Sequence, residues 1–224
     1  MSLPSQVTQR REKLESEKAK LAERYWNNDA VETLVSDLAD VMDQLILDAW
    51  HEQITQSKDI ALFAVGGYGR RELHPGSDID LLVVAKDPKS HGRAIELFLQ
   101  NVFDLNIEVG HSVRDITACV NECKADITVA TAMFERRLLG GDANLEASIA
   151  QALTKKKVWP AEKFFAAKYQ EQIERHKQFD DVDYNLEPNI KASPGGMRDI
   201  HTALWICNRN FGTTDISRLV EMNV

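Results

Sequence analysis

The sequence of 224 residues predicts an α+β protein, in which an α/β core is preceded by helices and followed by a helical region. Short apolar runs at residues 60–65, 78–85 and 105–113 are typical of strands, and segments with helical spacing separate them. This alternation of strand and helix indicates an α/β core. Beyond Asp115 the spacing is mainly helical, which predicts a second, helical part of the chain.

Two helices are expected before the core, at residues 8–25 and 29–54. In the second, apolar residues recur largely at intervals of three and four, and Asp29 is placed to cap its start. We expect both helices to pack on the core.

Glycine and proline divide the core into its elements. Gly66 and Gly67 end the first strand, and a short helix at 68–73 is predicted to stop at the turn that contains Pro75. The run Leu-Leu-Val-Val in the second strand indicates burial on both faces. A helix at 90–103 then leads to the third strand.

The helical part is expected to contain an irregular loop, at residues 180–194, before its last helix. The helices predicted beyond the core span residues 115–124, 126–137, 144–156, 161–179 and 198–208, with a break at Gly140 and Gly141. The predicted parts of the chain are residues 1–57 (N-terminal helices), 58–140 (core) and 141–224 (helical substrate-binding region, expected to be incomplete).

Composition excludes several classes of protein. The formal net charge of -8 and the pI near 5.3 argue against a nucleic-acid partner, because such binding depends on positive charge. No apolar run approaches the length of a membrane span. We therefore expect no membrane partner. Three cysteines do not form a disulfide framework, so we expect a cytoplasmic protein.

The most informative pattern is the pair Asp78 and Asp80 at the start of the second strand. Side chains alternate along a strand, so the two carboxylates share one face, with their Cα atoms about 6.5–7 Å apart. Such a pair is suited to holding two Mg²⁺ ions for phosphoryl chemistry. We interpret the chain as an enzyme that handles a nucleotide.

The residues before this pair are suited to binding phosphate. Gly66 and Gly67 allow the backbone to approach phosphate oxygens, and Arg70 and Arg71 can neutralise them. A solvated arginine pair is the alternative. Ser77 is a candidate for orienting the ligand or for capping the turn.

A third carboxylate is expected on a neighbouring strand. Glu108, between Ile107 and Val109, is our candidate for a catalytic and metal-binding residue, and Asp104 is the alternative. An exposed acid at a sheet edge is the non-functional interpretation of Glu108.

Later in the chain, Lys191 and Arg198 flank a glycine turn and are candidates for binding the nucleotide phosphates, with a solvated pair as the alternative. Tyr184, Asn185 and Glu187 are weaker candidates for lining the base or ribose. Cys119, Cys123 and His111 provide only three ligands, so buried thiols are favoured over a zinc site.

Three segments resemble a known family. Residues 66–75 (GGYGRRELHP), 108–114 (EVGHSVR) and 185–200 (NLEPNIKASPGGMRDI) are similar to the bacterial bifunctional uridylyltransferase/uridylyl-removing enzymes, within the DNA polymerase β-like nucleotidyltransferase superfamily. The likeness spans roughly residues 8–224. Many superfamily members have Gly-Ser where this chain has Gly66-Gly67.

The resemblance implies a mixed sheet with flanking helices. It also implies Mg²⁺-dependent transfer of UMP from UTP to a tyrosine of the signalling protein PII in nitrogen regulation, with release of pyrophosphate. It assigns metal binding to Asp78, Asp80 and Glu108. Complete members carry a His-Asp domain that removes uridylyl groups and two ACT domains that sense glutamine, and we expect this chain to lack both.

Other functions stay open. The third segment also resembles the glutamine synthetase adenylyltransferase, so adenylyl transfer or another small nucleotidyltransferase activity is the nearest alternative. A regulatory module that binds a nucleotide without transferring it, and an inert helical scaffold, are the remaining classes.

Overall fold

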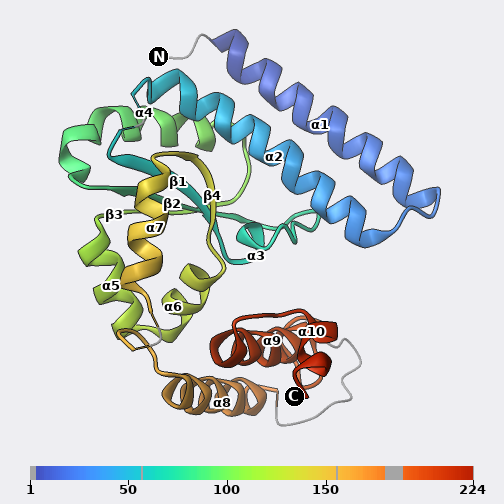
Figure 1. The fold of residues 1–224 in the computed structure, drawn as a ribbon. Helices are drawn as coiled ribbons and strands as arrows, with labels where there is room; N and C mark the ends of the chain where they lie inside the picture. Colours follow the sequence, from blue (N-terminus) through green and yellow to red (C-terminus); the bar gives the residue numbers. More distant parts are fainter. Residues whose placement is uncertain (1–3, 57, 155, 180–188, 224) are drawn as a thin grey trace. The chain divides into compact units, whose positions relative to one another are not determined.

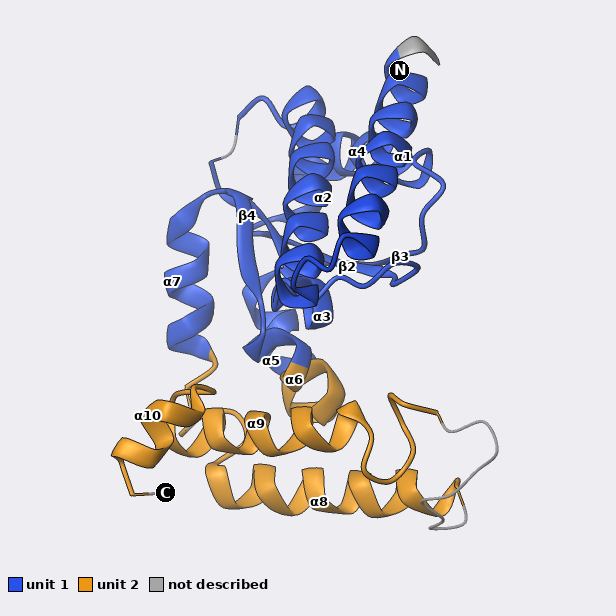
Figure 2. Ribbon diagram, turned by 90° about the vertical axis from the view of Figure 1, so that its right-hand side faces the viewer, with its two compact units in different colours: residues 1–122, 132–152 blue, residues 123–131, 153–224 orange. Residues whose placement is uncertain are grey.

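The computed structural model describes residues 4–56, 58–154, 156–179 and 189–223. The chain divides into two compact units (Figure 2). Unit 1 consists of Met1–Glu122 and Ala132–Ala152, and unit 2 of Cys123–Thr131 and Leu153–Val224. Among the described helices, none is long and apolar enough to cross a membrane.

Unit 1 contains a mixed four-stranded sheet in the order β3-β2-β1-β4. The strands are β1 (Ile60–Val65), β2 (Ile79–Ala85), β3 (Val109–Arg114) and β4 (Arg137–Gly141). β1 runs antiparallel to β2 and β4, whereas β2 and β3 are parallel. The predicted α+β class, with a mixed sheet and flanking helices, is therefore confirmed.

Helices cover both faces of the sheet (Figures 1 and 2). α2 (Val31–Gln53) and α4 (Gly92–Phe103) pack together on one face, where Trp50 meets Phe98 edge to face with ring centroids 5.2 Å apart. α7 (Ala143–Ala152) lies on the other face. Every residue of β2 except Asp80 is buried, as its apolar run predicted.

The N-terminal helices pack side by side (Figure 1). α1 (Pro4–Trp26) and α2 are joined by a turn in which Asn28 has a φ of 66°. Arg24 of α1 forms ion pairs with Asp29 and with Asp37 of α2, at 2.7 and 2.6 Å. Both predicted helices are confirmed, with small differences at their ends, but Asp29 does not cap α2: the N-cap is Ala30, without a side-chain hydrogen bond.

The structure corrects the predicted ends of the other core strands and the short helix between the first two. β2 begins one residue after Asp78, and β3 begins at Val109 instead of residue 105, so Asp78 and Glu108 precede their strands. The helix predicted at 68–73 is wrong. A single turn, α3 (Gly66–Gly69), replaces it, because Arg71 adopts a φ of 65° that a helix cannot continue through.

β4 was not predicted. Residues 137–141 were assigned to the end of a helix and a glycine break, but they pair with β1. Gly141 explains the pairing: a Cβ there would lie 2.4 Å from the carbonyl oxygen of Ile60, and its φ is +98°. Gly141 allows close strand contact here, and Gly140 allows Leu47 and Trp50 of α2 to approach the strand closely.

The remaining helices follow the predicted pattern, although α7 stops earlier than residue 156 and α10 was not predicted. They are η1 (Pro88–His91), α5 (Ile116–Ala125), α6 (Ile127–Phe134), α8 (Ala161–Lys177), α9 (Met197–Phe211) and α10 (Ile216–Glu221). Most of the loop predicted at 180–194 lies outside the described residues.

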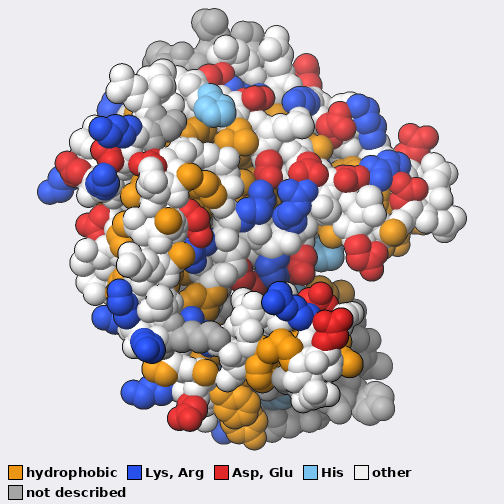
Figure 3. Space-filling view, in the orientation of Figure 1, with side chains coloured by type: hydrophobic (Ala, Val, Ile, Leu, Met, Phe, Trp, Pro, Cys, Tyr) orange, Lys and Arg blue, Asp and Glu red, His pale blue; other side chains and the backbone are white. Residues whose placement is uncertain are grey.

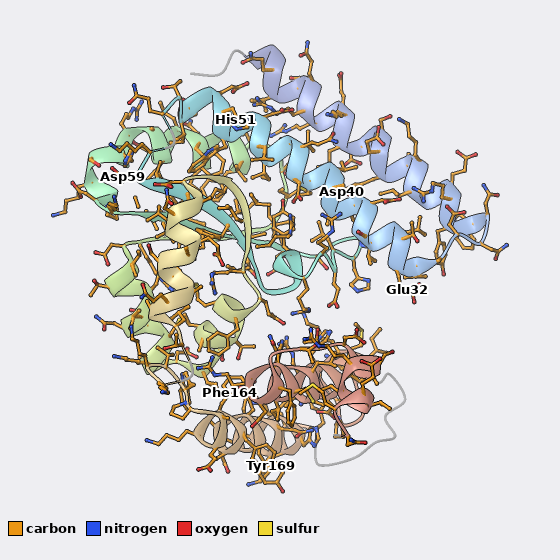
Figure 4. The ribbon with its side chains drawn as sticks, in the orientation of Figure 1. Glu32, Asp40, His51, Asp59, Phe164 and Tyr169 are labelled. Atoms are coloured by element: carbon orange, nitrogen blue, oxygen red, sulfur yellow. The ribbon has the colours of Figure 1, made fainter. Side chains whose placement is uncertain are left out.

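Unit 2 is built around α8 and α9. Phe164 of α8 is fully buried, whereas Tyr169 is exposed (Figure 4). The Nζ atom of the buried Lys168 lies 4.4 Å from the centre of the Trp205 ring and 2.8 Å from Glu171. Gly212 ends α9 with a left-handed φ of 79°, and its amide donates to the carbonyl of Asn208 at 2.8 Å.

Candidate functional site

The predicted site residues of the core gather at one end of the sheet in unit 1. Val65, the last residue of β1, pairs with Asp80 of β2, and Asp80 pairs with Gly110 of β3. Residues paired in register project from the same face of a sheet. Gly66 and the Asp80 side chain therefore lie at the same corner, although 14 positions separate them in the sequence.

The carboxylate of Asp80 lies against two glycines. A Cβ built on Gly110 would stand 2.2 Å from Oδ1 of Asp80, and one built on Gly66 would stand 3.3 Å from Oδ2. Gly66 also has a φ of +60°, a conformation that other residues rarely adopt. The two glycines thus leave the space in which this carboxylate lies.

Asp78 is the residue just before β2 begins, and Glu108 is the residue just before β3 begins. The amide of Ile79 donates to the carbonyl oxygen of Glu108 at 2.9 Å, which brings the two strand starts together. Each acid lies two residues before a member of the Asp80–Gly110 pair, at the starts of two parallel neighbouring strands. Both residues are exposed.

The described part of the chain contains no group of three His, Cys, Asp or Glu side chains arranged to hold a metal ion. Carboxylates repel one another, which opposes close grouping of three such side chains. Asp104, the alternative third acid, is half-buried at the end of α4, where its amide donates to the carbonyls of that helix. The ligand set therefore stays a prediction.

Both predicted phosphate-binding arginines form ion pairs within unit 1. Arg70 contacts Glu72 and Glu135, each at 2.7 Å. Arg71 contacts Asp40 of α2 at 2.5 Å (Figure 4 labels Asp40). In this arrangement the two guanidinium groups join the glycine corner to neighbouring elements.

A partly buried polar network, which sequence reasoning missed, adjoins the glycine corner through Tyr68 of α3. The hydroxyl of Tyr68 donates to Asp43 of α2 at 2.7 Å, and Arg137 of β4 donates to the same carboxylate at 2.6 and 3.0 Å. Burial, reinforced by the Asp43 charge, raises the pKa of Tyr68. The network holds α2, α3 and β4 together, and no spacing in the sequence indicates it.

The other predicted nucleotide-binding residues are placed as follows. Ser77 is exposed in unit 1, and its amide donates to the carbonyl of His74 at 3.0 Å. Lys191 and Arg198 belong to unit 2, where the amide of Arg198 donates to the carbonyl of Lys191 at 2.9 Å. The Arg198 guanidinium lies 5.5 Å from the centre of the Trp205 ring. Tyr184, Asn185 and Glu187 lie outside the described residues.

The cysteines behave as buried thiols. Cys119 and Cys123 are both fully buried, and burial raises the pKa of Cys119 to about 11. A thiol with so high a pKa is a poor metal ligand at neutral pH, because the thiolate is the species that binds. This agrees with the interpretation of these residues as packing groups.

Two models of known protein families match parts of this chain. The nucleotidyltransferase domain model matches residues 46–139, which include the sheet corner described above. The model described as GlnD PII-uridylyltransferase matches residues 163–224.

Several curated relatives carry one name, bifunctional uridylyltransferase/uridylyl-removing enzyme. The relative from Ectopseudomonas mendocina is 44% identical over 193 residues, which is 85% of this chain and 22% of the relative. The chain is a homologue of these enzymes. The relatives from Stutzerimonas stutzeri (43% identity, 90% of this chain, 23% of the relative) and Photobacterium profundum (45%, 86% and 22%) agree. The chain thus spans less than a quarter of the length of the relatives it matches.

Among solved structures, a toxin–antitoxin crystal structure with AMP-PNP aligns with 63% of this chain and 98% of its own chain, at 19% identity and a TM-score of 0.34. The family resemblance found in the three sequence segments is confirmed by the curated relatives and the two family models.

Proposed function

We propose that this chain transfers UMP from UTP to a tyrosine hydroxyl of a PII-type regulatory protein, releasing pyrophosphate, in nitrogen regulation. Homology to enzymes named uridylyltransferases supports the reaction class. The observation that carries the proposal is the Asp80 carboxylate, which lies against Gly66 and Gly110 at the sheet corner.

Asp78, Asp80 and Glu108 are the residues proposed to hold magnesium, with two ions as the expected number. The donor set fits, because Mg²⁺ prefers carboxylate oxygens, and exposed Asp78 and Glu108 keep the freedom to turn towards a cation. When bound, magnesium would neutralise phosphate charge and favour ionisation of the attacking hydroxyl. Glu108 is proposed to accept the proton of that hydroxyl.

The glycine corner is proposed to receive the triphosphate. Gly66 and Gly67 present backbone without side chains, so phosphate oxygens can approach closely. For Arg70 and Arg71 to bind the β- and γ-phosphates, each guanidinium must exchange a carboxylate partner for phosphate. Ser77, Lys191 and Arg198 are the further residues proposed to contact the nucleotide.

The test is transfer of label from α-labelled UTP or ATP to a purified PII-type protein with magnesium. We expect label from UTP, its loss with EDTA, and a fall of about a hundredfold or more for Asp80→Asn, because removing a metal ligand removes the stabilisation of transferred charge. Glu96→Gln is the control, since this exposed α4 acid pairs with exposed Arg93 on its own helix.

The possible outcomes separate the alternatives. Label from ATP alone would replace the proposal with adenylyl transfer. Binding of UTP without transfer would indicate a regulatory module. Wild-type transfer by both Asp78→Asn and Asp80→Asn would show that the proposed metal site is wrong.

A further inference from the structure

An apolar groove opens in unit 1 between the end of α1, the start of α2 and the loop before β2. Its volume is about 580 Å³. Leu34, Leu38 and Leu73 form a nearly buried floor, each with at most 8% of its surface exposed. Trp26 stands at the rim with 80% exposed. We call this cavity the α1–α2 groove.

The exposed residues of the α1–α2 groove include large aromatic side chains. Tyr25 and Trp26 meet edge to face with ring centroids 5.3 Å apart, and Val31, at the start of α2, is also exposed. Contiguous apolar surface of this kind marks a binding site more often than isolated exposed residues do. Tyrosine and tryptophan are also the residues that most often dominate the affinity of protein interfaces.

The α1–α2 groove lies close to the candidate active site, because some of the residues that line it directly precede Asp78 in the chain. His74, Pro75 and Gly76 line it, and Gly76 lies two residues before Asp78. Two residues of chain span at most about 7 Å, so the Cα atoms of Gly76 and Asp78 cannot be farther apart. The end of this groove at Gly76 therefore lies close to Asp78, one of the proposed metal ligands.

The lining favours an apolar occupant over the nucleotide, because a triphosphate needs several cations and hydrogen-bond donors, whereas Lys18 and His74 stand here among side chains that are largely aliphatic and aromatic. The net charge of -8 likewise disfavours a polyanionic acceptor. An apolar segment of a protein matches both the lining and the position.

We infer that the α1–α2 groove docks the hydroxyl-bearing segment of the protein acceptor, through apolar side chains that pack against Trp26 and Val31. The inference rests on the proposed transferase function and adds the surface that selects the acceptor. Docking here places the acceptor hydroxyl next to Asp78, while the nucleotide occupies the glycine corner.

The test measures binding of a purified PII-type protein to the whole 224-residue chain by calorimetry. Trp26→Asp and Val31→Asp place a carboxylate in the α1–α2 groove. Both positions are exposed, and an acid at the first position of α2 is favourable for the helix, so folding is preserved. Phe103→Asp is the matched control, since this α4 residue of unit 1 is also a large apolar side chain, 46% exposed, and lies outside this groove.

We expect each groove variant to weaken acceptor binding about tenfold or more and the control to bind like wild type. Wild-type affinity in both groove variants, or no acceptor binding by the wild-type chain at millimolar concentration, would overturn the inference. So would light scattering that shows a wild-type dimer dissociated by Trp26→Asp with acceptor affinity unchanged.

Transfer of label from UTP, measured on the same samples, separates this inference from the proposed function. If the chain transfers UMP but all variants bind the acceptor with equal affinity, the proposed function is supported and the proposed docking surface is wrong. If only the groove variants lose acceptor binding, but the wild-type chain transfers no label, the proposed docking surface is supported and the proposed function is wrong.

Discussion

Gly110 shows how one missing side chain shapes the candidate site. The Asp80 carboxylate occupies the space where a Cβ of residue 110 would lie. Because this carboxylate is the end of a flexible side chain, it rather than the backbone would move if a Cβ were present. Glu108 lies two residues before Gly110, just before β3 begins, so the glycine and the acid lie at the same end of this strand.

We therefore predict that Gly110→Ala lowers UMP transfer by about a hundredfold, because a displacement near 1 Å of a catalytic group has an effect of that size. The circular dichroism spectrum and the thermal midpoint should stay close to wild type. Transfer assays and thermal melts measure the two effects.

Gly92→Ala is the control for that substitution. No atom lies within 4 Å of a Cβ at Gly92, and this residue starts α4. Alanine there should preserve transfer and leave stability equal or slightly higher. Wild-type transfer by Gly110→Ala would mean that Asp80 does not need its position between the glycines.

At the scale of elements, single carboxylates join helices that are distant in sequence. In unit 1, Asp43 of α2 connects α3 and β4 through Tyr68 and Arg137. In unit 2, Asp199 of α9 accepts hydrogen bonds from Arg175 of α8 at 2.5 Å and from the amide of Gly195 at 2.7 Å. Such charge-assisted hydrogen bonds are stronger than neutral ones and hold the elements in register.

The hydrogen bonds that Asp199 accepts predict that the stability of unit 2 depends on pH. Burial opposes ionisation, but the hydrogen bonds from Arg175, Gly195, His176 and Gln172 outweigh it and lower the pKa of Asp199 to about 2. The ordinary pKa is about 3.9 in an unfolded chain. A lowered folded-state pKa contributes stability above about pH 4, and that contribution is lost as the pH falls towards 2.

Asp199→Asn should therefore destabilise unit 2 by about 1–3 kcal/mol at pH 7. The difference from wild type should shrink between about pH 4 and pH 2. Urea unfolding, followed by hydrogen exchange in peptides from residues 161–211, measures it. Asp215→Asn is the control, because Asp215 caps α10 in the same unit and asparagine caps equally well. An equal loss at pH 7 and pH 2 would contradict a role for the charge.

At the scale of the whole molecule, charge restricts the kind of partner. The chain has 35 acidic and 27 basic residues, which leaves a formal charge of -8. On the face seen in Figure 3, Lys and Arg side chains lie beside Asp and Glu side chains. Arg70, Arg71 and Arg137 form ion pairs with carboxylates within the chain, so they add little net positive potential.

We predict that the chain binds a 20-base-pair DNA duplex or a single-stranded RNA with a Kd weaker than about 100 µM at 0.15 M salt, the weak limit of ordinary non-specific binding. Fluorescence anisotropy with labelled oligonucleotides measures it, with a polylysine peptide as the positive control. A Kd below about 10 µM that weakens with salt would show a basic surface that the net charge conceals.

Local patterns in the sequence were sufficient to predict much of the fold. The runs at 60–65 and 78–85 predicted two central strands, the spacing of apolar residues predicted α2, and helices were also expected at the positions of α1, α4 and α8. These patterns succeed because burial repeats every second residue in a strand and about every 3.6 residues in a helix. The residues at the glycine corner and the family resemblance were likewise visible in short segments.

By itself, the sequence determined which residues are strand-forming, which are acidic at a strand start, and which family the motifs resemble. Only the tertiary structure decided that β4 pairs with β1, that Arg70 and Arg71 contact carboxylates, and that Gly110 leaves space for Asp80. The physical reason is distance along the chain: these contacts join residues 30 or more positions apart, such as Asp80 with Gly110 and Arg70 with Glu135. No local periodicity encodes such pairs, because they form only when the strands and helices pack together.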